Sequence, residues 1–180
     1  MLRQHKPKII CHGQDMAFSP MTPIKDGYKG YLNFEHYWQS GKVFENVPHE
    51  ISKAWWKSQT AAKRRHPKAK TNKVLYAKFD TYPDEEMDYI TSRKKIYVPE
   101  YYNLIKNSQQ IDILKKYLED GHNITVYDFD GPRNGKKKPI CEEVTKELLL
   151  NKIADTSHPF GHGYIVAACI CGIEQKSIFK

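Results

Sequence analysis

Apolar residues recur at helical spacing in the segment Tyr31–Glu45, whose sequence is YLNFEHYWQSGKVFE. The spacing i, i+3, i+4, i+7 is that of a helix with one buried face, and the residues that follow it are Phe34, Tyr37, Trp38, Gly41 and Phe44. A polar row of Glu35, Gln39 and Lys42 runs beside that face. Asn33 is a suitable N-cap, because its side chain can accept a backbone N–H of the first turn. The pattern predicts one helix that carries an acid, an amide and an amine along one side.

Helices dominate the rest of the chain. Apolar periodicity, prolines in first turns and acids near helix starts predict helices over Pro48–Lys57, Thr60–Arg65, Pro83–Lys95, Ile111–Glu119, Pro139–Ile153 and Pro159–Cys171, and a further helix that opens at Pro99. The final helix contains the run Tyr164–Cys171, which is apolar nearly all round. A helix without a polar face is expected to lie at the centre of a domain.

Strand signals are few and short. A strand is predicted near Lys8–Cys11 and another over Asn123–Asp130, where β-branched and aromatic residues precede a Gly-Pro stop. Asp26-Gly27 signals a turn that leads into Tyr31. No internal repeat or linker divides the sequence. We therefore predict a single compact helix-rich α+β domain over residues 1–180, with residues 1–32 as an irregular segment packed on its core.

The composition tells more about the cellular compartment of the protein than about any reaction it catalyses. The chain has 180 residues, a net charge of +8 and four cysteines. It has no apolar run long enough to span a bilayer, and its basic start lacks the apolar stretch of a secretory signal. The cysteines do not follow a zinc spacing, so we expect reduced thiols in a cytoplasmic protein, without a cofactor and without membrane contact.

Positive charge is concentrated between Ile51 and Phe79, where no Asp or Glu occurs. Two interpretations stand: a solvated basic loop, or a surface that binds phosphates of a nucleic acid or nucleotide. Trp55 and Trp56 favour the second slightly, since aromatic side chains stack on bases. The basic residues of the block are Lys53, Lys57, Lys63, Arg64, Arg65, Lys68, Lys70, Lys73 and Lys78.

Three carboxylates are candidates for catalysis. Glu35 lies among aromatic residues, where burial raises a carboxyl pKa and suits it to proton transfer; the alternative is a solvated polar face. Asp128 and Asp130 fall on one face at the end of the predicted strand. They are candidates for a second acid or for a metal ligand, whereas Asp130 alone has the simpler role of stabilising the Gly131-Pro132 turn.

Other polar clusters have modest interpretations. His158 and His162 have an i, i+4 metal spacing, but without a third ligand nearby we predict no metal, and Ser157 is expected to cap the last helix. Arg93 and Lys94 end a predicted helix, where the dipole alone favours cations. The chain contains no P-loop, no GxGxxG, no nucleophile elbow and no HExxH, which argues against kinases, Rossmann enzymes, α/β-hydrolases and zincins.

Taken together, these segments resemble the NADAR family of YbiA-like N-glycosidases. The specific match is Glu35–Phe44, EHYWQSGKVF, to the family pattern E-H-[YF]-x-Q-x-x-K-[FV]. It is preceded by the Phe-Pro entry segment Phe18–Pro23 and followed in order by further segments up to Asp130. The chain departs from the family pattern after that acid, because Gly131–Gly135 lacks the Trp of the usual W-G-x-G signature.

The resemblance implies a YbiA-like fold and hydrolysis of the N-glycosidic bond of a ribosylated, phosphate-bearing substrate, such as an ADP-ribosyl adduct or a ribosylamino-pyrimidine. It implies Glu35 as the main catalytic carboxylate and Asp128 or Asp130 as the second acid. Carried over in the same way, the substrate contacts are Ser19, His36, Tyr37, Gln39, Lys42, Arg93, Lys94 and His158. The alternative is a non-catalytic module that binds nucleic acid or senses ADP-ribose through the segment Lys53–Lys78.

Overall fold

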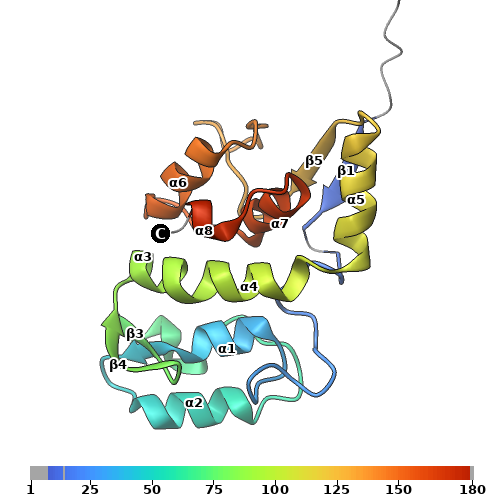
Figure 1. The fold of residues 1–180 in the computed structure, drawn as a ribbon. Helices are drawn as coiled ribbons and strands as arrows, with labels where there is room; N and C mark the ends of the chain where they lie inside the picture. Colours follow the sequence, from blue (N-terminus) through green and yellow to red (C-terminus); the bar gives the residue numbers. More distant parts are fainter. Residues whose placement is uncertain (1–7, 14, 179–180) are drawn as a thin grey trace, which may run out of the picture. The chain divides into compact units, whose positions relative to one another are not determined.

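The computed structural model describes residues 8–13 and 15–178, and its path is drawn in Figure 1. Short helices alternate with two small sheets, which confirms the α+β class. The chain forms two compact units: an aromatic unit, Pro20–Tyr97, and an α7 unit made of Met1–Ser19 and Val98–Lys180. Each is described below by itself, and the single domain over residues 1–180 stays a prediction.

The aromatic unit combines two helices with a three-stranded antiparallel sheet of order β2-β3-β4. α1 begins after the N-cap Asn33, whose side chain accepts the His36 N–H as the sequence predicts. The elements of the unit are α1 (Phe34–Ser40), β2 (Lys42–Phe44), α2 (His49–Lys57), the 3₁₀ helix η1 (Pro67–Lys70), β3 (Val74–Phe79), β4 (Tyr82–Met87), α3 (Tyr89–Ser92) and the π-helix η2 (Arg93–Tyr97).

Aromatic rings fill the core of this unit. Phe34 and Trp56 have no exposed surface, and Trp38 stacks on Phe79 with ring centroids 5.8 Å apart. The predicted buried stripe of α1 is thus confirmed. Offset and edge-on ring pairs bury large apolar areas with defined geometry, so they fix α1 against the sheet.

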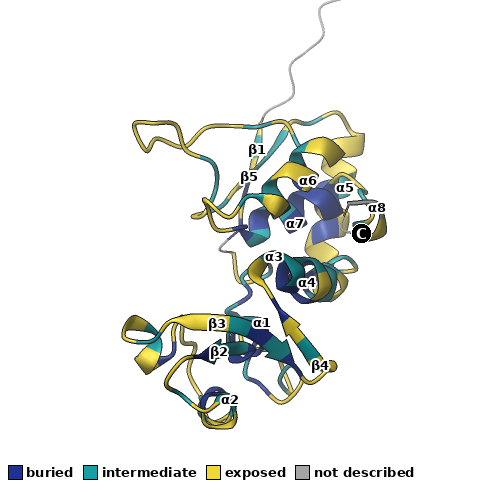
Figure 2. Cartoon of the chain, turned by 90° about the vertical axis from the view of Figure 1, so that its left-hand side faces the viewer, coloured by how far each residue is buried: buried dark blue, intermediate teal, exposed yellow. Residues whose placement is uncertain are grey.

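The α7 unit is organised around one apolar helix. α7 (His162–Ile170) is buried along nearly its whole length (Figure 2) and packs against α4, α5 and β5. Its central position was predicted from its lack of a polar face. The other elements are the parallel pair β1 (Ile9–His12) and β5 (Ile124–Tyr127) with α4 (Val98–Ile105), α5 (Gln109–Glu119), α6 (Lys146–Ala154) and α8 (Gln175–Ile178).

One helix prediction is wrong throughout and two are wrong in their first part. Pro83–Met87, expected to start a helix, belongs to strand β4, because a tight turn after Phe79 pairs Tyr82 back on β3. As an edge strand β4 tolerates its proline. The segment Thr60–Arg65 is irregular, and α6 starts only at Lys146 instead of Pro139.

The first predicted helix is too long. α1 ends at Ser40, and the residues that continue its spacing turn into strand β2, which pairs with β3. Gly41 allows this turn to lie against the core, since a Cβ there would be only 2.2 Å from Cζ of Phe79. Lys42 therefore projects from a strand and not from the helix.

The cysteines and the helix lengths agree with two further expectations. All four cysteines lie in the described part of the chain and are free thiols, with Cys11 and Cys169 buried. Within residues 8–13 and 15–178, no helix has the length and apolar character needed to cross a bilayer.

Candidate functional site

The polar row predicted beside α1 does come together in the aromatic unit. The Gln39 Nε2 donates a 2.7 Å hydrogen bond to Oε1 of Glu35, one helical turn before it. Both side chains are half-buried. A carboxylate held by an amide in this way has one oxygen fixed in orientation, which is a useful property in a group that must face a substrate.

Lys42 joins this pair from strand β2. Burial lowers the pKa of its amine, the nearby Arg65 guanidinium lowers it further, and the Glu35 carboxylate partly opposes both. Lys42 therefore lies within electrostatic reach of both Glu35 and Arg65, although it projects from a strand and not from the predicted helix. We call Glu35, Gln39, Lys42 and Arg65 the Glu35 cluster. It combines a carboxylate held by an amide with Lys42 within its reach and Arg65 within reach of Lys42, and such groups can stabilise a cationic sugar and hold phosphate.

His36, predicted to contact substrate, is fully buried behind the Glu35 cluster. Its Nε2 accepts a 2.8 Å hydrogen bond from the Lys63 N–H, and its ring packs on Trp56 with centroids 4.9 Å apart. Burial, the largest cause, lowers the pKa of the imidazole. His36 therefore acts as a neutral acceptor that fixes the basic loop, and its contact with substrate stays a prediction.

A second histidine holds the same loop. His66 is buried between Phe44 and Trp55, with ring centroids 5.6 and 4.7 Å away, and its Nδ1 accepts the Lys68 N–H at 3.2 Å. Burial lowers its pKa as well. The loop that His36 and His66 hold in place carries the exposed cations Lys63, Arg64 and Arg65. Sequence analysis placed these cations in a basic block, but no spacing rule linked Arg65 to Glu35.

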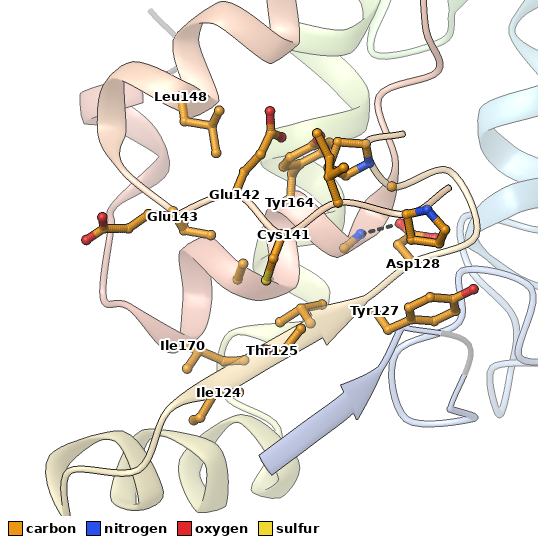
Figure 3. A pocket seen from close by; sticks show the side chains of 18 of the residues that line it. Ile124, Thr125, Tyr127, Asp128, Cys141, Glu142, Glu143, Leu148, Tyr164 and Ile170 are labelled. Atoms are coloured by element: carbon orange, nitrogen blue, oxygen red, sulfur yellow. Dashed lines mark hydrogen bonds between the residues drawn. The ribbon is translucent and has the colours of Figure 1, made fainter. Parts of the chain in front are cut away.

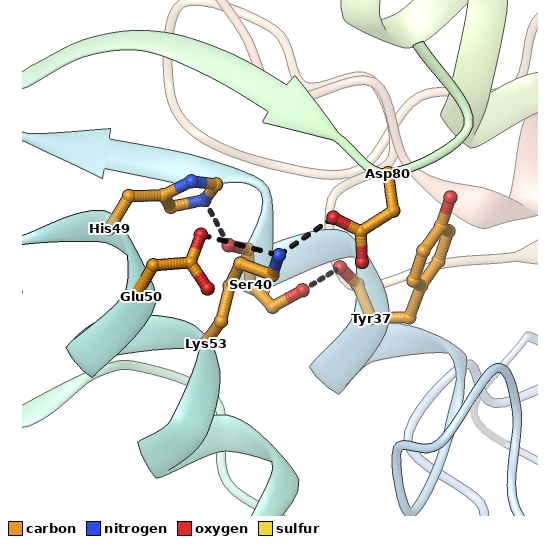
Figure 4. Close-up of polar contacts among 6 residues, drawn as sticks. All are labelled: Tyr37, Ser40, His49, Glu50, Lys53 and Asp80. Atoms are coloured by element: carbon orange, nitrogen blue, oxygen red, sulfur yellow. Dashed lines mark hydrogen bonds and ion pairs between the residues drawn. The ribbon is translucent and has the colours of Figure 1, made fainter. Parts of the chain in front are cut away.

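Not all of the basic block faces solvent. The Lys53 side chain is only 14% exposed, because its Nζ lies 2.7 Å from Oδ1 of Asp80 and 3.5 Å from Oε1 of Glu50 (Figure 4). Beside it, Nε2 of His49 contacts the Ser40 carbonyl at 3.0 Å. These contacts tie α2 to α1 and to the turn between β3 and β4. Lys53 therefore has a structural role, and a phosphate that binds its amine would have to displace Asp80 and Glu50.

Two more predicted substrate contacts of this unit are also engaged in packing. Tyr37 belongs to the aromatic core, with its hydroxyl 3.4 Å from Nζ of Lys29. Arg93 is 1% exposed, and its guanidinium carbon lies 3.9 Å above the centre of the Tyr89 ring. Lys94, beside it in η2, is half-buried. Their contacts with a substrate stay predictions.

In the α7 unit, Asp128 caps the start of α7. Its Oδ2 accepts a 2.7 Å hydrogen bond from the Gly163 N–H and lies 3.5 Å from Nδ1 of His162 (Figure 3). A Cβ on Gly161 would come within 2.4 Å of the same oxygen. The two glycines on either side of His162 thus make room for the carboxylate. This cap replaces the predicted one, because Ser157 lies before the helix and Gly161 is its N-cap residue.

The remaining predicted site residues of this unit lie at its surface or in a turn. Asp130 is exposed, and its backbone N–H contacts Oδ1 of Asp128 at 3.4 Å. His158 is exposed and lies 2.8 Å from the Ser157 hydroxyl. Ser19, in the entry segment, donates its N–H to the Asp15 carbonyl. Among residues 8–13 and 15–178, no three His, Cys, Asp or Glu side chains lie close enough together to hold a metal ion.

Comparison with known proteins gives one match. The model of a family of unknown function, DUF6939, matches residues 20–142, which span the whole aromatic unit and continue into the α7 unit as far as Glu142. No curated protein and no solved structure matches the chain.

Proposed function

We propose an activity for this chain from its own residues, because it belongs to DUF6939, a family of unknown function. The activity is that of an N-glycosidase, which hydrolyses the bond between a ribose and a base or amine in a phosphate-bearing substrate. The observation that carries the proposal is the Glu35 cluster, in which the Gln39 amide holds the carboxylate, Lys42 lies within electrostatic reach of it, and Arg65 lies within reach of Lys42. The resemblance of Glu35–Phe44 to the NADAR pattern supports the same chemistry.

The reaction needs little besides a positioned carboxylate. As the C1–N bond breaks, its electron pair leaves with the base, and positive charge develops on the ribose. A fixed carboxylate stabilises that charge and accepts a proton from the water that attacks C1, and a proton returned through solvent neutralises the departing nitrogen. Glu35 is assigned this role, with Gln39 fixing one of its oxygens. Lys42 and Arg65 are assigned to the substrate phosphates.

The proposal rests on the aromatic unit alone. The second acid, Asp128 or Asp130, stays a prediction, as do a YbiA-like fold and a cytoplasmic location. The substrate we propose is an ADP-ribosyl adduct or a ribosylamino-pyrimidine, and the reaction as drawn uses no cofactor. Free thiols on all four cysteines are compatible with a reducing compartment.

Glu35→Gln tests the mechanism directly. The amide keeps the shape and the contact with Gln39 but removes the charge, so turnover of an ADP-ribosylated nucleobase should fall at least about 100-fold. Release of reducing ribose measures turnover, and thermal unfolding checks the fold. Glu45→Gln is the matched control, because Glu45 is an exposed carboxylate just beyond β2. Unchanged turnover in Glu35→Gln, with an intact fold, would exclude the mechanism.

One observation favours a second candidate, a module that binds ADP-ribose or nucleic acid without turnover. The basic loop is held by His36 and His66 and presents its cations to solvent. Such a module would bind ADP-ribose or DNA with a steep salt dependence, and Glu35→Gln would not weaken binding. Calorimetric titration beside the hydrolysis assay separates the two functions.

A further inference from the structure

The α7 unit contains a cavity of about 710 Å³ that the proposed function does not use (Figure 3). It lies between β5, α7 and the long irregular stretch from Gly131 to Val144. Its volume is within the range of pockets that bind small organic molecules. A long loop without secondary structure beside such a pocket is also typical of binding sites.

One part of the lining is apolar. Ile124 and Val126 of β5 meet Ala167 and Ile170 of α7, and Leu148 of α6 completes this surface. In Figure 3, Ile124, Thr125 and Ile170 lie below the cavity, opposite Glu142 and Tyr164. Such a surface suits the hydrocarbon or aromatic body of a ligand.

Another part of the lining is acidic. Burial, followed by the charge of Glu142, a hydrogen bond with the Glu142 side chain and the smaller effects of Asp128 and Asp155, raises the pKa of the Tyr164 hydroxyl. All three groups are carboxylates, so the wall near Tyr164 carries acidic groups although the chain has a net charge of +8, and Lys152 pairs with only one oxygen of Glu142. A negative wall favours a cationic group.

Glu142 also has a carboxylate oxygen that can accept a hydrogen bond from a ligand. Its Oε1 lies 3.0 Å from Nζ of Lys152, whereas its Oε2 is buried and has no hydrogen-bond partner in the described part of the chain. Leaving a buried charged acceptor without a donor costs free energy, which a ligand N–H would recover.

The two basic residues that line the cavity do not offset this preference. Arg133 donates one guanidinium nitrogen to the Phe129 carbonyl at 3.2 Å and another to the Lys137 carbonyl at 3.1 Å. Lys8 is exposed at the start of β1. Neither presents a buried guanidinium or amine to an anion.

We propose that this cavity binds a small organic cation with an apolar body, an aromatic or branched alkyl amine. The ammonium donates to Oε2 of Glu142, and the body covers the apolar surface formed by β5 and α7. This site is independent of the Glu35 cluster and does not rest on the proposed glycosidase.

Three probes with one body and different charges test the proposal on the full chain: 2-phenylethylamine, 2-phenylethanol and phenylacetate. Titration followed by backbone amide NMR should show the amine binding about tenfold tighter than the alcohol, with phenylacetate weakest. The shifted amides should include Val126 and Ala167. Equal or tighter binding of phenylacetate, or shifts confined to other residues, would overturn the proposal.

Glu142→Gln should remove the preference for the amine over the alcohol. Glu143→Gln is the matched control, because Glu143 also lines the cavity but is exposed, and it should keep the preference within about twofold. If Glu142→Gln fails to fold, the ranking of the three probes on the unmodified chain still decides the outcome. A full preference in a folded Glu142→Gln protein would contradict the role of Glu142.

Discussion

The two units use their candidate carboxylates in opposite ways. In the aromatic unit, Glu35 accepts a hydrogen bond from the Gln39 amide, and Lys42 lies within electrostatic reach of its carboxylate. In the α7 unit, Asp128 is held by a backbone N–H at the start of a buried helix and by His162. A carboxylate that accepts a backbone N–H at a helix start has a structural role in the fold, whereas one placed near a cationic side chain has the surroundings that a catalytic acid needs. This difference makes Glu35 the better candidate for catalysis.

The units also differ in what makes their packing specific. The aromatic unit relies on ring packing and on two buried histidines that accept backbone N–H groups. The α7 unit relies on an apolar helix whose start is fixed by Asp128. Substitutions in the ring packing and buried histidines of the aromatic unit should therefore leave the start of α7 intact, and substitutions at Asp128 should leave the aromatic core intact.

The largest effect is expected from Gly41→Ala in the aromatic unit. A Cβ at this position would lie 2.2 to 2.8 Å from three atoms of the Phe79 ring, which cannot withdraw because it stacks on Trp38. Overpacking of this kind should cost about 3 kcal/mol of unfolding free energy, measured by urea titration. Gly135→Ala is the control, since nothing lies within 4 Å of a Cβ there. Equal stability of the two variants would show that the ring moves freely.

Gly41 also shows which features of the aromatic unit the sequence alone predicts and which it does not. The spacing rule correctly predicts the buried face of α1, but it counts Gly41 and Phe44 as further helical positions. The pairing of β2 with β3 decides otherwise, and the periodicity of a short segment carries no information on a partner about thirty or more positions away. The acids after Pro83 mislead for the same reason, because they satisfy a helix-start rule inside an edge strand.

The candidate site was predictable in part. Glu35, Gln39 and Lys42 were chosen as a row on one helix, and they do meet, although Lys42 reaches the cluster from a strand. The burial of His36 was not foreseen, because the family motif places it beside the catalytic acid without showing which way its ring points. Arg65 is one of the cations of the basic block, and the sequence does not show that the folded loop brings it near Lys42.

The next largest effect is a loss of stability of the aromatic unit at low pH, because His36 and His66 are buried in it. Burial lowers the pKa of His36 and His66 below the ordinary value of 6.5. On acidification the unfolded chain therefore takes up protons first, so stability is complete above about pH 6.5 and falls below it. The slope is at most about 1.4 kcal/mol per pH unit for each histidine.

Thermal unfolding between pH 7 and pH 5 measures this loss. The groups that face His36 are the Trp56 ring and the backbone and charge of Lys63; those that face His66 are Phe44, Trp55, Trp56 and Lys68. Replacing His36 by Gln should flatten the profile. The exposed His158 provides the control, and His158→Gln should leave the slope as it is. An unchanged slope in His36→Gln would mean that the pKa of His36 is the same in the folded and the unfolded chain.

The smallest effect is expected from Asp128→Asn, and it sharpens the comparison most. The amide oxygen can still accept the Gly163 N–H, so only the charge at the helix start is lost, at a cost of about 1 kcal/mol. Faster hydrogen exchange of the Gly163 amide, with Asp130→Asn as the exposed control, would identify Asp128 as a cap. If exchange were unchanged while glycosidase turnover collapsed, Asp128 would instead be the second catalytic acid, and the division between the two carboxylates would fail.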